Sequence, residues 1–368
     1  MKKIIRTIAL VLAATITLLA LSACAKNNEN PPETQKNVVE VVDMAGNNIV
    51  LKDYATSIFC QSSIFEQIVL ALGAESTLRA SSYSRTDDAR NLWFQSLYPQ
   101  IMDVEAAGGD KSGITNELLV SYDLDLMLVA NQDQYDEFTA IGIPCAVLDI
   151  QTLDDLLFGI EIIGKCLGGH YQEKSKNVIA YCSKLLADVK QKVNQLSETD
   201  RKTAYFMESR YAAVEPTLYM TWGADSFQAN CLKMAGINTV ADALFAGGVR
   251  AEITTEQLLL SNPDAIVIGG FYEQTNYDAL LKEENLKTLS AVENGLIYRV
   301  PVGASEWSRI GVESFLLPVW YGTVFYPDLY KDTDIQSVVK DFYKNVMGIE
   351  LSAEYQTLIL SGAEGPTK

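Results

Sequence analysis

The stretch Ile58-Phe-Cys-Gln-Ser-Ser-Ile-Phe-Glu-Gln-Ile-Val-Leu-Ala-Leu-Gly73 contains the unit from which the fold is built. Its first three residues are apolar and predict a short buried strand, and the polar turn after them leads into an apolar run with helical spacing. Ser63 and Glu66 have the spacing of a capping box, and Gly73 is a suitable helix stop. The stretch therefore predicts a strand, a turn and a short helix.

The same alternation of short apolar runs and longer amphipathic runs continues along the chain, as in α/β domains. Near-continuous apolar runs predict parallel strands that are covered on both faces. They fall into two groups, one at 126–130 and 145–149 and the other at 204–207, 265–268 and 296–300. We therefore expect an α/β fold with two Rossmann-like lobes, each with a central, mostly parallel sheet.

A helical stretch separates the two groups of strands. Apolar residues recur mostly at intervals of three and four from Leu153 to Leu196, which favours one long linker helix, taken as residues 153–198. Gly168 and Gly169 interrupt this pattern, and paired glycines disfavour a continuous helix. Two separate helices are therefore the alternative.

The first residues predict export. Lys2, Lys3 and Arg6 precede an apolar run, Ile8 to Leu21, that is shorter than the roughly 20 residues needed to span a bilayer. Leu21-Ser-Ala-Cys24 resembles the lipobox of bacterial lipoproteins, which implies cleavage before Cys24 and lipidation of its sulfur. A retained apolar anchor is the alternative. Residues 24–37 are polar and contain proline, which predicts a disordered tether.

Composition excludes several classes of function. The formal charge is −18, and it falls to −21 without the three cations of the signal segment, so binding of nucleic acid or anionic lipid is not expected. His170 is the only histidine, which excludes a histidine-rich zinc or manganese site. The cysteines beyond Cys24 show no zinc-site spacing, and we expect them to be buried as small apolar residues: Cys60, Cys145, Cys166, Cys182 and Cys231.

Two segments of similar sequence occupy matching places in the two halves. Asn116-Glu-Leu-Leu119 leads into Leu124-Asp-Leu-Met-Leu128, and Thr255-Glu-Gln-Leu-Leu259 leads into Asn262-Pro-Asp-Ala-Ile-Val267. Each resembles a helix-then-strand unit of the substrate-binding proteins of ABC importers, in the class that handles iron siderophores, haem and cobalamin. Leu124 stands where that family usually has proline. The pair of units supports two similar lobes.

Further motifs of that family occur in the same order along the chain. They are the Asp-x-x-Gly hairpin at Val42–Asn47, the first helix at Phe65–Ala74, Gly-x-x-Ser-Phe at 223–227 with Ala235–Asn238, and a C-terminal segment with Trp307, Glu313-Ser314, Trp320 and Tyr326-Pro327. Ile237 replaces a glycine of the family pattern. The resemblance implies a ligand cleft between two lobes that a long helix joins.

The resemblance also implies a function. It describes an extracytoplasmic binding lipoprotein, a monomer and not an enzyme, with no cofactor or resident metal. This lipoprotein captures an iron chelate, either a ferric siderophore or haem, and delivers it to an ABC importer permease and its ATPase. Cobalamin and an oxyanion such as molybdate are alternative ligands. It would be held by lipid on the outer face of the cytoplasmic membrane, or in a periplasm if the cell has an outer membrane.

Candidate site residues fall into two groups. Loops after strands carry the binding residues of α/β lobes, because backbone amides and helix starts converge there. The nominated ligand-binding residues are Ser62, Ser63, Tyr83, Arg85, Tyr211, Tyr219, Trp222, Arg250, Trp307 and Arg309, with Arg250 and Trp307 favoured. Trp320 and Tyr326 are expected in the core. In this family one acidic residue per lobe docks on the permease, and Glu117 and Glu256 match those positions; the alternative is a glutamate that merely favours a helix start.

Two rival classes of function remain. A surface-anchored enzyme lacks support, because no nucleophile elbow, zinc-protease motif or phosphate loop is present. A glycan-binding lipoprotein would predict a mostly β architecture. The predicted organisation is a signal peptide (1–23), a tether (24–37), an N-terminal lobe (38–152), a linker helix (153–198), a C-terminal lobe (199–348) and a C-terminal tail (349–368).

Overall fold

A four-stranded parallel sheet lies at the centre of the N-terminal lobe. Its strands are β3 (Ile58–Cys60), β4 (Leu78–Ala80), β5 (Leu126–Val129) and β6 (Cys145–Val147), in the order β4-β3-β5-β6. The computed structural model describes residues 38–81, 89–107 and 114–362. The signal peptide, the tether with Cys24, and Tyr83 and Arg85 lie outside the described residues.

The C-terminal lobe repeats this sheet. Its strands are β7 (Thr203–Glu208), β9 (Asn238–Thr239), β11 (Ala265–Gly269) and β12 (Ile297–Arg299), all parallel, in the order β9-β7-β11-β12. In both lobes the second strand along the chain lies outside the first, and the third and fourth follow on the other side. The prediction of an α/β fold with two similar parallel sheets is confirmed, and the predicted strands lie within a few residues of the observed ones.

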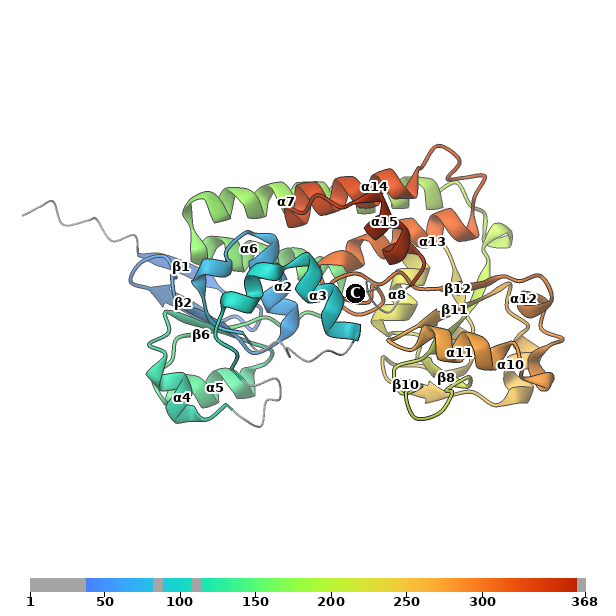
Figure 1. Ribbon diagram of the computed structural model, residues 1–368, viewed down its shortest axis with the longest axis horizontal. Helices are drawn as coiled ribbons and strands as arrows, with labels where there is room; N and C mark the ends of the chain where they lie inside the picture. The colour runs from blue at the N-terminus through green and yellow to red at the C-terminus, as the bar shows by residue number, and fades with distance from the viewer. Residues whose placement is uncertain (1–37, 82–88, 108–113, 363–368) are drawn as a thin grey trace, which may run out of the picture. The chain divides into compact units, whose positions relative to one another are not determined.

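Helices cover the sheets, and two short antiparallel ribbons accompany them (Figure 1). The ribbons are β1 (Val39–Val42) with β2 (Asn48–Leu51), and β8 (Met220–Trp222) with β10 (Arg250–Glu252). The helices before the linker are α2 (Ser63–Ala71), α3 (Ala89–Leu97), α4 (Asn116–Ser121) and α5 (Gln132–Ala140). Those after it are α8 (Phe227–Met234), α9 (Ala241–Leu244), α10 (Thr255–Ser261), α11 (Glu273–Leu280), α12 (Ser290–Glu293), α13 (Leu317–Phe325), α14 (Ile335–Phe342) and α15 (Ala353–Leu360).

The linker consists of two helices, α6 (Leu153–Leu167) and α7 (Gly169–Val193), so the single continuous helix is wrong and the alternative is right. Gly168 ends one helix and begins the other with φ of 64°, a left-handed conformation that glycine adopts without strain. The two helices then pack against each other, as Figure 1 shows. α7, with 25 residues, is the long helix that the family resemblance implied.

Alternate residues of each sheet face different hydrophobic clusters. In the N-terminal lobe Phe59 and Met127 face a local cluster, whereas Ile58 and Leu126 face the largest cluster. The C-terminal lobe divides its strands in the same way, and the largest cluster continues through α6, α7 and the C-terminal helices. Because both sheets share this cluster, the residues from Val38 onward form one compact unit.

Local sequence explains several helix ends. The cap of α2 is Ser62 and not Ser63, because the Ser62 hydroxyl accepts a hydrogen bond from the Ile64 backbone N–H at 3.3 Å. Gly73 follows the end of this helix as expected, with φ of 71°. The predicted tail includes α15, whose Ile359 is fully buried. Within the described residues, no helix is long and apolar enough to cross a membrane.

Candidate functional site

A cavity of about 350 Å³ is bounded by segments of both lobes. The C-terminal lobe contributes residues that follow β7, β11 and β12, at the carboxyl ends of its parallel strands. The N-terminal lobe contributes Ile64 in the first turn of α2, and Gln151 and Thr152 just before α6. Loops at this edge of an α/β sheet are the usual place for a ligand.

Five charged residues of the C-terminal lobe line this cavity, and Asp225 is one of them. Glu208 is the last residue of β7, Arg210 follows it, and Glu306 and Arg309 lie in the loop after β12. Burial, and then the charge of Glu208, raise the pKa of the Glu306 carboxyl, while the Arg309 guanidinium opposes this rise. The guanidinium of Arg309 also lies 4.9 Å from the centre of the Phe271 ring, which lines the cavity beside it.

Trp222 forms an aromatic wall and is fixed in place by Glu208. Its indole N–H donates a hydrogen bond to Oε2 of Glu208, and Oε1 of the same carboxylate accepts the Arg210 backbone N–H at 2.8 Å. Beside Trp222, the guanidinium of Arg250 lies 4.4 Å from the Tyr211 ring centre and 5.9 Å from the Trp222 ring. Three of the nominated residues therefore gather into one aromatic and cationic cluster.

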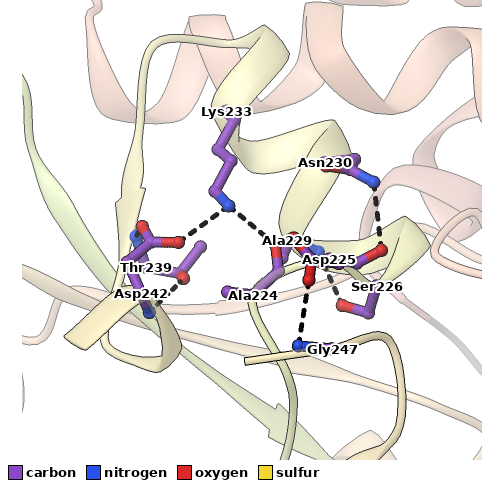
Figure 2. Close-up of polar contacts among 9 residues, drawn as sticks. All are labelled: Ala224, Asp225, Ser226, Ala229, Asn230, Lys233, Thr239, Asp242 and Gly247. Atoms are coloured by element: carbon purple, nitrogen blue, oxygen red, sulfur yellow. Dashed lines mark hydrogen bonds and ion pairs between the residues drawn. The ribbon is translucent and has the colours of Figure 1, made fainter. Parts of the chain in front are cut away.

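The wall next to this cluster is a loop at Asp225 that is tied by hydrogen bonds to the neighbouring loop at Gly247, and Figure 2 shows the bond to the Asp225 carboxylate. Asp225 donates its N–H to the Gly247 carbonyl at 3.0 Å, and the Gly247 N–H donates to the Asp225 carboxylate at 2.9 Å. Lys233 reaches back from α8 to the Ala224 carbonyl at 2.6 Å. A Cβ atom on Gly223 would collide with the Gly247 carbonyl oxygen, which explains the glycine of the Gly-x-x-Ser-Phe motif.

Two helix starts also line the cavity. Ser226, the serine of that motif, caps α8 by accepting the Ala229 N–H at 3.1 Å, and Thr152 caps α6 in a capping box with Asp155. Both caps border the cavity. The free backbone N–H groups of a helix start carry partial positive charge, so they add to the arginines in favouring an anionic ligand.

The structure places the nominated ligand residues in different surroundings. Trp222 and Arg309 line the cavity, and Tyr211 and Arg250 stand next to Trp222. Arg250 belongs to strand β10 and not to an irregular segment. Ser62 and Ser63 begin α2 immediately before Ile64, and Tyr219 packs against the core of the C-terminal lobe.

Trp307 corrects the sequence interpretation. Its side chain is fully buried in the largest hydrophobic cluster, although its neighbours Glu306 and Arg309 line the cavity. The preference for Trp307 as a cleft residue is therefore wrong. Trp320 and Tyr326 are buried as predicted.

Several cavity residues were not among the nominated ones. Glu208 and Arg210 lie within three residues before Tyr211, Phe271 follows the Gly269-Gly270 pair at the end of β11, and Glu306 precedes Trp307. The rule that residues after parallel strands line the site would have found the first three of these. The buried position of Glu306 has no local sequence signal.

Glu117 and Glu256 occupy equivalent places in the two lobes. Each is the second residue of its helix, after a capping threonine, and each is exposed. The equivalence extends to the turn before the next strand, where Asp123 (φ 49°) and Asn262 (φ 37°) are the two non-glycine residues with positive φ in the described chain. The two predicted helix-then-strand units therefore share backbone geometry.

The five cysteines of the described residues are free and buried, as expected. Burial raises the pKa of their thiols, to about 12 for Cys145 and Cys166, which keeps them protonated. His170 is exposed in the first turn of α7 and is not among the residues that line the cavity. No group of three histidine, cysteine or acidic side chains suited to a metal ion occurs in the part of the chain that the structure describes.

The fold is that of a two-lobed α/β protein with a cavity between its lobes, an architecture that this chain shares with solved solute-binding proteins. A scan against family models finds no match. The molybdate-binding protein MolA of Haemophilus influenzae is 22% identical over 360 residues, covering 91% of this chain and 95% of the relative. This relative is described as a binding protein and not as an enzyme, which agrees with the expectation from the sequence.

Two solved structures extend the comparison. A periplasmic solute-binding protein from Veillonella parvula has a TM-score of 0.73 at 19% identity, covering 88% of this chain and 97% of the other. A protein of an ABC-type Fe³⁺-hydroxamate transport system from Saccharomonospora viridis has a TM-score of 0.55 at 19% identity, covering 78% and 99%. The family resemblance in the motifs is confirmed at the level of the fold.

Proposed function

We propose that this chain is the solute-binding component of an ABC importer and that it captures an anionic iron chelate in the interlobe cavity. The observation that carries this proposal is the cavity itself, which both lobes border and which Arg210, Arg309, Trp222 and Phe271 line. Arginine forms paired, charge-assisted hydrogen bonds with carboxylate or catecholate oxygens, and aromatic faces pack against the organic part of a chelate. The relative from an Fe³⁺-hydroxamate system supports the same ligand class.

Molybdate is the second candidate, and the similarity to a molybdate-binding protein favours it. The arginines and the helix starts that line the cavity would also suit a small oxyanion. Aromatic walls contribute little to binding of such an ion, whereas they contribute directly to binding of a chelate. For this reason we place the iron chelate first.

Ligand titration tests the proposal. Tryptophan fluorescence of the purified chain is followed while a ferric tris-catecholate, haem, cyanocobalamin or molybdate is added. We expect the ferric chelate to bind, and Arg309→Ala to weaken it about ten- to a hundredfold through the loss of charge-assisted hydrogen bonds. Arg79→Ala is the matched control, because Arg79 is exposed and pairs with Glu105 outside this cavity. Saturable binding of molybdate alone would favour the second candidate, and no binding of any probe would contradict the proposal.

Docking to the permease is the role we propose for Glu117 and Glu256. Two exposed carboxylates at equivalent positions can orient the protein on basic residues of a membrane partner and speed their encounter. Glu117→Ala combined with Glu256→Ala should leave the Kd of the ligand unchanged and abolish uptake by whole cells. Ordinary uptake in the double variant would remove these residues from docking.

Attachment to the membrane is the role we propose for Cys24. A lipidated Cys24, followed by the polar residues 25–37, would hold the binding lobes outside the cytoplasm and within reach of the permease. Cys24→Ala should release the protein from the membrane fraction and remove the mass of the lipid from its first residue.

A further inference from the structure

Two carboxyl groups meet in the wall of the cavity. Glu208 and Glu306 are 4% and 1% exposed, and they come from segments about a hundred residues apart, at the end of β7 and after β12. Gly270 lies between them. A Cβ atom on Gly270 would stand 3.0 Å from Oε1 of Glu208, and the Gly270 backbone forms a hydrogen bond with Glu306. Two buried carboxylates so close together cannot both be ionised without a large cost.

The two carboxyl groups differ in their surroundings. Both oxygens of Glu208 accept donors, from the Arg210 backbone and from the Trp222 indole, which stabilises the ionised form. Oε1 of Glu306 accepts the Ser308 backbone N–H and the Ser308 hydroxyl, and the Gly270 backbone also forms a hydrogen bond with this carboxyl group. Burial and the charge of Glu208 raise the pKa of the Glu306 carboxyl. Because both oxygens of Glu208 face N–H donors and burial disfavours a charge on Glu306, the proton of the pair is best placed on Glu306.

The other groups around Glu306 do not compete for this proton. Arg309 faces it from the same loop, and Tyr321 faces it from α13. Burial raises the pKa of the Tyr321 hydroxyl well above its usual value, so this side chain stays neutral. Arg210 and Asp225 complete the charged lining of the cavity. With Glu306 neutral, the charges of Arg210 and Arg309 balance those of Glu208 and Asp225 in the cavity lining. The starts of α6 and α8 then leave a small excess of positive potential.

We propose that Glu306 is a specificity-determining residue that takes part in binding as a neutral carboxylic acid. In this form it offers the cavity a hydrogen-bond donor, so the preferred ligand is an oxygen-rich anion that binds together with one proton on Glu306. Ionisation of Glu306 would place a second carboxylate beside Glu208 and repel the same ligand. This inference rests on the proposed function, since it concerns the ligand of that cavity.

The pH dependence of binding tests the inference. Kd is measured for a ferric tris-catecholate and for molybdate between about pH 6.5 and about pH 9, and we expect affinity to fall up to about tenfold per pH unit above the raised pKa. Glu306→Gln keeps a donor and cannot ionise. It should match the wild-type affinity within about threefold at the acidic end and show no alkaline loss.

Glu313→Gln is the matched control. Glu313 is also buried, and burial raises its pKa to about 7, but its carboxylate accepts hydrogen bonds from Tyr343 and the Ser305 backbone and is not among the residues that line the cavity. This variant should keep the wild-type pH profile. Calorimetry in buffers of different ionisation enthalpy gives an independent reading on the unaltered chain, which should take up a proton when ligand binds at alkaline pH.

The possible failures are distinguishable. Equal pH slopes in the wild type and in Glu306→Gln, or binding without proton uptake at alkaline pH, would overturn this inference alone. Failure of the folded wild-type chain to bind either probe at any pH would overturn the proposed function and this inference with it.

Discussion

The two lobes share a backbone plan and differ in what their equivalent loops carry. After the first strand of each sheet, the N-terminal lobe offers Ile64 to the cavity, whereas the C-terminal lobe offers Glu208 and Arg210. After the fourth strand, the N-terminal lobe offers Gln151 and Thr152, whereas the C-terminal lobe offers Glu306 and Arg309. Every charged residue that lines the cavity thus belongs to the C-terminal lobe, among the described residues.

This difference shows that the parallel sheet fixes where ligand residues stand, while the loops decide what they are. Strand order and the direction of the strands bring the loops after the first and the fourth strand to the cavity in both lobes. The N-terminal residues that line the cavity are uncharged and stand at helix starts, so this lobe supplies helix starts rather than side-chain charges. The C-terminal lobe supplies the side-chain charges that can discriminate one ligand from another.

The largest expected effect concerns the loop after the fourth strand of each sheet, and it tests how this loop is anchored in the two lobes. The C-terminal loop is held by the fully buried Trp307, whereas the N-terminal loop ends in the Thr152 cap. Trp307→Ala should lower the free energy of unfolding by about 3–5 kcal/mol, because it leaves a large cavity in the core. Thr152→Ala should cost about 1 kcal/mol. Denaturant unfolding measures both, and equal costs would contradict the difference in anchoring.

A second prediction concerns the wall that only the C-terminal lobe has. Gly223→Ala should lower the free energy of unfolding by about 1–3 kcal/mol and weaken ligand binding, because the new methyl group collides with the Gly247 carbonyl and forces the two loops apart. Gly248→Ala is the control in the same pair of loops, since its Cβ would meet the nearest atom, the Asp225 carbonyl oxygen, at 3.5 Å. If Gly223→Ala lowers the free energy of unfolding and the ligand affinity no more than Gly248→Ala does, the close contact between Gly223 and the Gly247 carbonyl does not hold the two loops together.

The smallest expected effect concerns a contact that the two lobes share, in which an aspartate accepts hydrogen bonds at the start of the first strand of the sheet. Asp125 accepts three hydrogen bonds at the start of β3, two from backbone N–H groups and one from the Thr56 hydroxyl, whereas Asp264 accepts one, from the Thr203 N–H at 2.8 Å. Both side chains are exposed. We expect Asp125→Ala to lower the free energy of unfolding by about 2 kcal/mol and Asp264→Ala to lower it by about 1 kcal/mol, as measured by thermal unfolding. The reverse order would mean that hydrogen-bond number does not set the stability of these turns.

Local sequence predicted the strands and most helices because their signals are local. Apolar runs such as 126–130 and 265–268 form buried parallel strands wherever both faces are covered. The cap of α2 was misplaced by one residue because Ser62 and Ser63 are both good caps, and backbone conformation chooses between them. The break at Gly168 could be foreseen as an alternative, but not the packing of α6 on α7 that makes it favourable.

The candidate site was harder to predict, because it depends on contacts between distant segments. Trp222, Tyr211 and Arg250 were nominated from separate loops, and the β8–β10 ribbon brings them together. Trp307 was misjudged, because nothing in its neighbourhood tells which residues of an irregular loop point inward. The meeting of Glu208 and Glu306 requires both sheet order and the close approach at Gly270.

The fold class and the two matching lobes could be predicted from the amino-acid sequence, since hydrophobic periodicity and ordered motifs are properties of the chain alone. Only the tertiary structure decided which side chains reach the cavity, that its charges come from one lobe, and that Glu306 lies beside Glu208. The physical reason is that burial and electrostatic coupling depend on distance in space, and folding brings together charges that lie far apart along the chain.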